Sequence, residues 1–280
     1  MRTSHRGSAL RFLPQKLFIM VLKLWRAVAD LLFPRCCEVC GRELMLNEKF
    51  LCLECYAQLP LTYFWKIEEN PAERSFWGRA RIEGVCSLFY YTDSYKKLVH
   101  SLKYRSNVKA GLWMGQMLGS RIPFPTDCII PVPLHWRKQW LRGYNQSEII
   151  ARGVVKGIIS RSDAAHGAED VADMPGCGLA ENSIKRRCER AKSPKIVTDL
   201  LQRRIFTQTQ THKDRLGRWE SVSRAFRLNP ASMAKYDLNG KRILLIDDVL
   251  TSGATLDACA NLLLAHYDCK VYIATLAYVE

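Results

Sequence analysis

Two adjacent carboxylates, Asp247 and Asp248, end the apolar run in "KRILLIDDVLTSGATLDAC" (residues 241–259), and a loop of small hydroxyl residues around Gly253 follows them. In a parallel α/β sheet, ligands bind outside the carboxyl ends of the strands, where each strand turns into a helix. The N–H groups at the start of that helix and the loop hydroxyls can bind a phosphate, which Gly253 lets the backbone approach closely. The carboxylates can accept hydrogen bonds from sugar hydroxyls and can act as outer ligands of a hydrated Mg²⁺ ion. The stretch therefore predicts a site for a phosphorylated ribose.

The segment "ILLIDDVLTSGAT" closely resembles the phosphoribosyl-pyrophosphate (PRPP) motif of type I phosphoribosyltransferases. The resemblance implies that Asp247 and Asp248 hold the ribose hydroxyls. It implies that five consecutive residues hold the 5-phosphate: Thr251, Ser252, Gly253, Ala254 and Thr255. It also implies that Mg²⁺ is bound chiefly through PRPP oxygens, and that transfer passes through an oxocarbenium-like state whose positive charge the catalytic acid pair would stabilise. The alternative is an ordinary strand-to-helix connection with capping residues.

Four cysteines are spaced as two pairs, Cys37-x-x-Cys40 and Cys52-x-x-Cys55. Two such pairs can supply four thiolates to a tetrahedral Zn²⁺ ion, and four protein ligands make such a site structural and not catalytic. The neighbouring Cys36 could replace Cys37 in the site. Disulfide pairing is the alternative, and it is disfavoured by the cysteine usage of the whole chain.

The chain has 280 residues, a formal net charge of +15 and a pI near 9.4. Its hydrophobic fraction of 48% is typical of a globular protein with a substantial core. The positive charge indicates either a solvated Lys-rich face or attraction to a polyanion, such as nucleic acid or a phosphorylated ligand. The 11 cysteines are odd in number and several lie in apolar surroundings, which favours a reducing cytoplasm over a secreted disulfide scaffold.

Residues 1–33 contain an apolar stretch, "LFIMVLKLWRAVADLLFP", that charged residues interrupt repeatedly. No uncharged run is long enough to cross a bilayer, so we expect no transmembrane segment. The uncharged core is also short for a signal peptide, and no small-residue cleavage site follows it. The apolar residues recur at helical spacing, which predicts an amphipathic helix. Docking of this helix on the protein itself is favoured over docking on a membrane surface.

From Val85 onward, short apolar runs alternate with helix-like stretches. We expect strands at 85–91, 126–134, 241–247 and 270–279, and helices at 93–104, 108–122, 145–160 and 255–267. This order predicts an α/β fold with a largely parallel sheet flanked by helices. Residues 161–195 lack a sustained apolar period and are expected to form a polar insert.

Three further segments narrow the resemblance: "LKYRSN" (102–107), "IIPVPLHWRKQWLRGYNQSE" (129–148) and "RRIFTQTQTHKDRLGRWESVSRAF" (203–226). Together with the cysteine pairs they look like the ComF family, named for competence for DNA uptake. The resemblance covers residues 30–160 and 194–280. It implies a zinc-ribbon-like module at 34–60 and a type I phosphoribosyltransferase-like domain at 85–280.

The turn "PVPL" ends a predicted strand beside the acid pair, and the resemblance implies that Val132 and Pro133 contact the pyrophosphate. A simple strand stop at the prolines is the alternative. The segment "RGYNQ" supplies hydrogen-bond donors at the start of a predicted helix: Arg142, Tyr144, Asn145 and Gln146. We assign these to anion or substrate contact, while helix capping by Asn145 is an equally serious account.

Residues 203–226 correspond, by the same resemblance, to a flexible hood that type I enzymes place over the substrate. Basic side chains in a hood could close on pyrophosphate and exclude water, although charged runs are ordinarily solvated faces. The residues selected for this role are Arg204, Gln210, Arg215 and Arg218. The family commonly has Asn where this chain has Ser221 and Gly where it has Arg224, so the hood departs from the pattern in part.

Two classes of function follow. The first is a transferase that moves ribose 5-phosphate, a pentosyl group, from PRPP or a related phosphorylated ribose. The second is an accessory protein in natural transformation that binds single-stranded DNA and acts with DNA-uptake proteins; a PRPP sensor without turnover is a third reading. Aromatic residues among the cations could stack on bases, but we favour ordinary core or boundary positions for them: Tyr95, Tyr104, Trp136, Trp140, Tyr144 and Trp219.

Overall fold

The structure, a computed structural model, describes residues 20, 35–104, 107–167, 193–204 and 225–280. By its internal contacts the chain divides into two compact units, residues 1–58 and 59–280. The amphipathic helix expected at 1–33 lies outside the described residues except for Met20, which is helical. Among the helices of the described residues, none combines the length and the apolar character that a membrane span requires.

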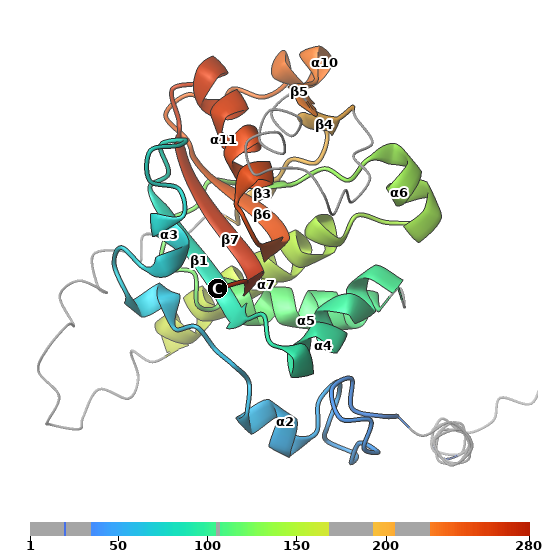
Figure 1. Ribbon diagram of the computed structural model, residues 1–280. Helices are drawn as coiled ribbons and strands as arrows, with labels where there is room; N and C mark the ends of the chain where they lie inside the picture. Colours follow the sequence, from blue (N-terminus) through green and yellow to red (C-terminus); the bar gives the residue numbers. More distant parts are fainter. Residues whose placement is uncertain (1–19, 21–34, 105–106, 168–192, 205–224) are drawn as a thin grey trace, which may run out of the picture. The chain divides into compact units, whose positions relative to one another are not determined.

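The second unit is built on a sheet of five parallel strands in the order β1-β7-β6-β2-β3 (Figure 1). The strand bounds are Gly84–Tyr90 for β1, Cys128–Pro131 for β2, Lys195–Ile196 for β3, Arg242–Leu250 for β6 and Lys270–Tyr278 for β7. Helices pack on both faces of this sheet. The predicted fold class, a parallel sheet flanked by helices, is confirmed.

The central strand β6 is buried on both faces, as its apolar sequence predicts for a parallel sheet. Ile243 and Leu245 pack in the core that includes α11, while Leu244 and Ile246 are equally buried on the other side. The strand does not stop at Asp247, as we expected, but runs to Leu250, because β7 continues to pair with it there.

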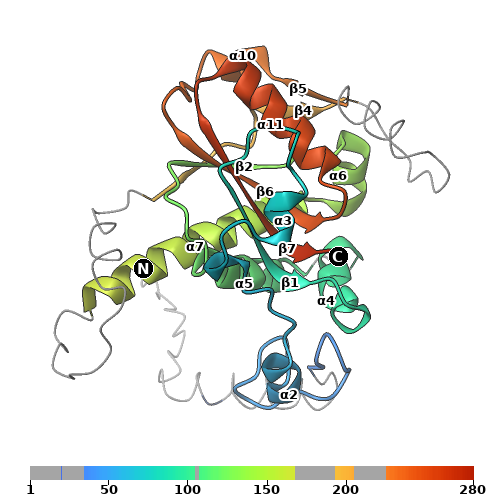
Figure 2. The same cartoon turned by 60° about the vertical axis from the view of Figure 1, so that its left-hand side comes forward.

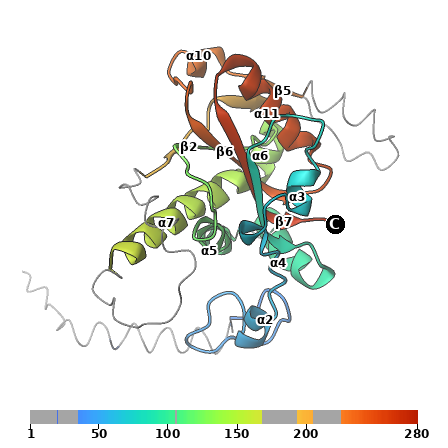
Figure 3. The same cartoon turned by 90° about the vertical axis from the view of Figure 1, so that its left-hand side faces the viewer.

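Helices α5 (Val108–Gly119) and α7 (Gln146–Gly167) cover one face of the sheet, with α4 (Asp93–Tyr104) packed beside α5 (Figure 2). The opposite face carries α11 (Ala254–His266) and the short α3 (Pro71–Arg74), as the view along the sheet in Figure 3 shows. Helix α7 continues seven residues into the expected 161–195 insert, and residues 168–192 lie outside the described part of the chain.

Glycines line the contact between α5 and α7, where the two helix backbones touch. A Cβ atom added at Gly119 would lie 2.2 Å from the Val154 carbonyl oxygen, and one at Gly157 would lie 2.2 Å from that of Gln116. No side chain fits at these positions without moving a helix. The contact therefore fixes the position of α7, including its first residues, relative to α5.

Two short strands leave the main sheet and form an antiparallel pair, β4 (Leu201–Arg203) and β5 (Phe226–Leu228), followed by α10 (Pro230–Met233). The hood expected at 203–226 thus begins and ends in a hairpin stem. Residues 205–224, with the predicted hood residues Gln210, Arg215 and Arg218, lie outside the described residues. Arg204 is described and is exposed at the end of β4.

An arm precedes β1, and no element was predicted in it. It contains the 3-10 turn η1 (Phe64–Lys66) and α3, whose capping box joins the Asn70 and Glu73 side chains to each other's backbone. Asn70 is buried, and its Nδ2 donates to the Val85 carbonyl at 3.0 Å, while Glu73 Oε1 accepts from the Val85 N–H at 3.1 Å. These bonds anchor the arm to the edge strand β1.

The first unit is small and contains α2 (Leu53–Ala57) and an isolated bridge between Cys36 and Glu43. Its buried residues include Leu44, Leu51 and three of the four predicted zinc ligands. The few buried apolar side chains of residues 35–58 give little core on their own, and a module of this size usually needs a metal or disulfides to fold.

Candidate functional site

The acid pair lies where β6 continues past the end of its neighbour β2. Pairing between the two strands ends at Pro131 and Ile246, with one further bond from the Val132 N–H to the Ile246 carbonyl at 2.9 Å. Asp247 and Asp248 come next on β6, and both side chains are half-buried. Both carboxylates therefore lie at the carboxyl edge of the sheet, past the end of β2, which is where ligands bind in open parallel sheets.

The Asp247 side chain supplies a hydrogen-bond acceptor that β2, which has already ended, cannot supply. Along a strand, alternate residues present their N–H and C=O groups to the same side, so the Asp248 N–H faces the side where β2 has ended. This N–H donates instead to Oδ1 of Asp247 at 2.9 Å. The same Oδ1 accepts the hydroxyl of Ser147 at 3.1 Å, and both bonds orient the Asp247 carboxylate.

The start of α7 joins this carboxylate to the "PVPL" turn. Oδ1 of Asn145 accepts the Ser147 N–H at 3.1 Å, which is the helix cap considered above, and Nδ2 of Asn145 donates to the Val132 carbonyl at 3.0 Å. Residues from "PVPL", "RGYNQS" and "ILLIDD" thus meet at one edge of the sheet. Ser147 was not among the predicted site residues, and only its place directly after "RGYNQ" pointed to it.

The loop after β6 is open to solvent at its hydroxyl residues. Thr251 and Ser252 are exposed, and Gly253 adopts a positive φ of 74°, which favours glycine. Helix α11 begins at Ala254, one residue earlier than expected, and Ala254 and Thr255 are half-buried. The first turn of α11 has no side-chain cap, and the exposed Thr251 and Ser252 precede it. Uncapped N–H groups at a helix start and nearby hydroxyls are the groups that bind phosphate.

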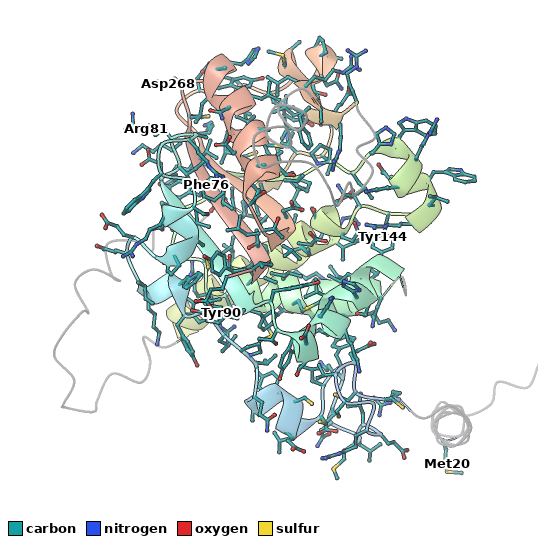
Figure 4. The ribbon with its side chains drawn as sticks, in the orientation of Figure 1. Met20, Phe76, Arg81, Tyr90, Tyr144 and Asp268 are labelled. Carbon is teal, nitrogen blue, oxygen red and sulfur yellow. The ribbon has the colours of Figure 1, made fainter. Side chains whose placement is uncertain are left out.

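The arm before β1 contacts the loop between β6 and α11, which the sequence did not predict. Nη1 of Arg79 donates to the Ser252 carbonyl at 2.6 Å, and the Phe76 ring, labelled in Figure 4, lies 3.1 Å from where a Cβ of Gly253 would be. The buried Asp257, in the first turn of α11, accepts the N–H of Ala80 at 2.8 Å. Three contacts therefore position the loop and the helix start.

Arg203, at the end of β4, is a second residue that the sequence analysis did not select. Burial lowers the pKa of Arg203, whereas the charge of Asp247 acts to raise it. Its guanidinium lies over the Phe226 ring, 5.3 Å from the ring centre. The side chain thus places a partly buried positive charge within electrostatic reach of the acid pair.

The remaining predicted residues lie around this centre. Arg142 is the last residue of α6 (Trp136–Arg142), and the Tyr144 hydroxyl donates to the Leu102 carbonyl at the end of α4 (Figure 4). Pro133 and Arg204 line a groove of about 540 Å³ that Asn145 also borders. Gln146 is buried at the start of α7.

The four cysteines of the first unit form a compact cluster. The sulfurs of Cys37, Cys40, Cys52 and Cys55 all lie within 4.8 Å of one another, and those of Cys40 and Cys52 are 3.8 Å apart. A tetrahedral site with Zn–S bonds of about 2.3 Å places its sulfurs about 3.8 Å apart, so the cluster has the dimensions of a zinc site. The exposed Cys36 lies outside the cluster.

Backbone donors favour a thiolate at one of these ligands. Burial raises the pKa of Cys37, but hydrogen bonds from the Cys40, Cys52 and Val39 backbone outweigh it and bring the pKa to about 7. Gly41, with a positive φ of 77°, closes the first turn and donates its N–H to the Cys37 carbonyl at 2.9 Å. This is the donor set of a structural site, in which all four positions come from the protein.

Comparisons with known proteins support a phosphoribosyltransferase-like domain in this chain. Residues 201–280 match the family model of the phosphoribosyl transferase domain. The chain is 28% identical over 237 residues to DNA utilization protein YhgH of Salmonella typhi, covering 81% of this chain and 83% of the relative. It is 24% identical over 239 residues to the protein of the same name from Escherichia coli K12, with the same coverage. It is 27% identical over 137 residues to competence protein F of Haemophilus influenzae, which covers 49% of this chain and 44% of the relative.

The parallel sheet, the domain match and the acid pair at the sheet edge define a phosphoribosyltransferase-like protein with an additional four-cysteine module. Together with relatives named for competence and DNA utilization, these features support a ComF-family protein.

Proposed function

We propose that this protein binds PRPP at the carboxyl edge of its sheet. The observation that carries the proposal is the acid pair, Asp247 and Asp248, placed beyond the end of β2 and followed by an exposed hydroxyl loop at the start of α11. The carboxylates would accept the ribose hydroxyls. The loop N–H groups and the hydroxyls of Thr251, Ser252 and Thr255 would bind the 5-phosphate.

A bound PRPP would direct its pyrophosphate toward the "PVPL" turn, where Val132 and Pro133 would contact it. Mg²⁺, held chiefly by PRPP oxygens, would offset the charge of the pyrophosphate, and the acid pair suits outer contact with such a hydrated ion. Contact of the hood with the departing pyrophosphate stays a prediction. It concerns Arg204, at the start of the hood, and Gln210, Arg215 and Arg218. Arg142 stays a prediction for anion contact.

Transfer of ribose 5-phosphate would follow from this binding. The bond between C1 of the ribose and pyrophosphate breaks, and pyrophosphate leaves with the electron pair. An acceptor nucleophile then bonds to C1 and gives up its proton. The half-buried acid pair would stabilise the positive charge that develops on the sugar, as a preorganised electrostatic group does.

A second candidate function is an accessory role in DNA uptake that includes binding of single-stranded DNA. The names of the relatives support it, as does the net charge of +15. DNA-uptake proteins would then be partners, and a reducing cytoplasm would be the compartment, in line with the cysteine usage. Fold alone does not decide between these functions, because one fold can carry different sites.

A thermal-shift experiment tests PRPP binding. PRPP with Mg²⁺ should raise the melting temperature, because a ligand that binds only the folded state stabilises it. Asp247→Asn with Asp248→Asn should abolish this shift, and an unchanged shift in the double variant would remove the assignment. A pyrophosphate-release assay against bases, nucleosides and DNA then separates a transferase from a PRPP sensor, which would bind without release.

A further inference from the structure

A groove lies between α6 and the β4–β5 hairpin, with a volume of about 540 Å³. The buried His135 is hydrogen-bonded to both sides of the groove, α6 and the end of β4. Its Nδ1 accepts the Arg137 N–H at the start of α6, at 3.3 Å, and its ring bonds to the backbone of Arg204 at the end of β4. The groove is therefore held at both sides by packed structure.

Large aromatic side chains stand exposed on α6. Trp136, which lines the groove, is 63% exposed, and Trp140, one turn further on, is 80% exposed. We expected such aromatics to be core or boundary residues; that expectation is confirmed for Tyr95, at 7% exposed, and is wrong for these two. Two exposed indoles on one short helix form an apolar surface of a kind that marks an interaction site.

The facing wall of the groove is positively charged. Arg204 and Arg227 are both exposed, and Nε of Arg227 donates to Oε1 of Gln202 on the paired strand at 2.9 Å. The two acids in the groove have partners of their own: Glu148 pairs with Arg152 at 2.6 Å, and Asp199 with Lys235 at 3.6 Å. The groove thus presents arginines opposite an indole.

We propose that this groove binds single-stranded nucleic acid, with bases stacked on Trp136 and Trp140 and phosphates paired with Arg204 and Arg227. Exposed aromatic rings opposite cations in a groove are the arrangement used for single strands, since unpaired bases offer their faces and the backbone offers charge. A lipid surface fits less well, because a concave wall and a helix of seven residues present little area to a flat membrane.

The groove reaches the proposed ribose-phosphate site. Asn145 borders the groove and also accepts the N–H of Ser147, whose hydroxyl binds Asp247. A strand in the groove would therefore lie beside the acid pair. The inference deepens the second candidate function and rests on it, but it does not require PRPP binding.

Fluorescence anisotropy with a labelled oligothymidylate of about 20 nucleotides tests the aromatic wall. Trp136→Ala should weaken binding at least about 5-fold, because stacking is worth about 1–3 kcal/mol per base. Trp140→Ala should weaken it in the same direction. Trp77→Ala is the matched control, since Trp77 is also 63% exposed. Each ring also has an arginine over it: Arg137 lies 5.2 Å from the ring centre of Trp136, and Arg74 lies 5.8 Å from that of Trp77.

A salt titration tests the charged wall. Arg204→Gln with Arg227→Gln should reduce the slope of log affinity against log salt by about 1.4, since each single-strand phosphate contact contributes about 0.7. Arg81→Gln should leave the slope unchanged. Figure 4 shows Arg81 near Asp268, with which it lines another pocket, and far from Tyr144 in the connection between α6 and α7.

The outcomes separate the groove from the function it serves. If the wild-type protein binds the oligonucleotide and the groove variants bind equally well, the groove assignment is wrong while DNA binding stands. If the wild-type protein does not bind the oligonucleotide at low salt, both the groove assignment and the second candidate function are wrong. PRPP binding is tested separately by the thermal shift. A third outcome would overturn the proposal in favour of a membrane contact. In it, the wild-type protein binds phosphatidylserine vesicles but no nucleic acid, and Trp136→Ala abolishes the vesicle binding.

Discussion

The hydroxyl of Ser147 lies 3.1 Å from Oδ1 of Asp247, a hydrogen bond between residues 100 positions apart in the chain. Ser147 is only 5% exposed, so water does not readily replace its hydroxyl. The bond holds the carboxylate that would receive the ribose, and it connects α7 on one face of the sheet to the ligand edge of β6.

Ser147→Ala should weaken PRPP binding roughly 5-fold, the equivalent of about 1 kcal/mol for one lost hydrogen bond. Isothermal titration with PRPP and Mg²⁺ measures this change. Ser160→Ala is the matched control, because Ser160 lies on the same helix, is exposed, and bonds only to the Lys156 carbonyl among the contacts described. Equal affinity in the two variants would show that Ser147 does not position the acid pair.

Arg79→Gln should weaken PRPP binding by about 3- to 10-fold. The Arg79 side chain holds the Ser252 carbonyl, and without it the loop that we propose binds the 5-phosphate would have more conformations to lose on binding. Arg81→Gln removes a nearby charge without touching the loop, because the Arg81 side chain is 88% exposed and pairs with Glu83. A similar loss in both variants would mean that general charge, and not the loop contact, is responsible.

The cysteine cluster should hold about one zinc ion per chain by elemental analysis. Cys55→Ser should abolish the bound zinc, because a thiolate ligand is lost from a site with four protein ligands. Cys36→Ser should leave it unchanged, since Cys36 lies outside the cluster. Zinc content that is equal in both variants would contradict the assignment.

Removal of zinc by a chelator should unfold the first unit selectively, because metal binding and folding are coupled in modules of this kind. Limited proteolysis should then cleave within residues 35–58 well before it cleaves the sheet unit, residues 59–280. Simultaneous loss of both units would show that their stabilities are linked.

Asp127 and Arg242 form a bidentate ion pair where β2 and β6 begin, with contacts of 2.8 and 2.6 Å. The Arg242 guanidinium lowers the pKa of Asp127 below its ordinary value, although burial opposes the shift. A lowered pKa in the folded state means that the pair adds stability above the unfolded pKa of about 3.9 and that this stability is lost as the pH falls through the folded value.

Asp127→Asn should therefore cost about 1 kcal/mol at neutral pH, since the Arg242 and Asp127 side chains are 42% and 33% exposed and the pair is partly screened by solvent. The difference from the wild type should begin to shrink below about pH 4, where the carboxylate of the unfolded chain becomes protonated, and should disappear as the pH falls through the lowered pKa of the folded state. Denaturant titrations at pH 7 and pH 3 measure both quantities. Asp268→Asn, at an exposed carboxylate, is the control and should change little at either pH.

Much of the sheet could be predicted because strands buried on both faces read as unbroken apolar runs. The segments for β6 and β7 were found for this reason, but β6 ends three residues later than expected, at Leu250, since its last residues depend on pairing with β7. The segment for β2 proved shorter, Cys128–Pro131, because its prolines cannot continue the ladder.

The parts of the site that sequence did not reveal depend on contacts between distant segments. Arg79 and Phe76 belong to an arm without an apolar period, so only its docking on the α11 loop shows its role. Ser147 looks like any serine near a helix start until β6 is placed beside it. Trp136 and Trp140 have the helical spacing of a buried face, yet they are 63% and 80% exposed. Within the described ranges no element covers them, and nothing in the local sequence indicates this.

The glycine-lined contact between α5 and α7 limits how this protein can respond to a ligand. Shear motions in proteins slide one helix past another across a layer of side chains, which re-pack in small steps. Gly119 and Gly157 remove that layer, so α7 has no such steps available against α5. Any rearrangement at the acid pair that accompanies binding would then have to arise in the connecting loops, with the two helices acting as a fixed base.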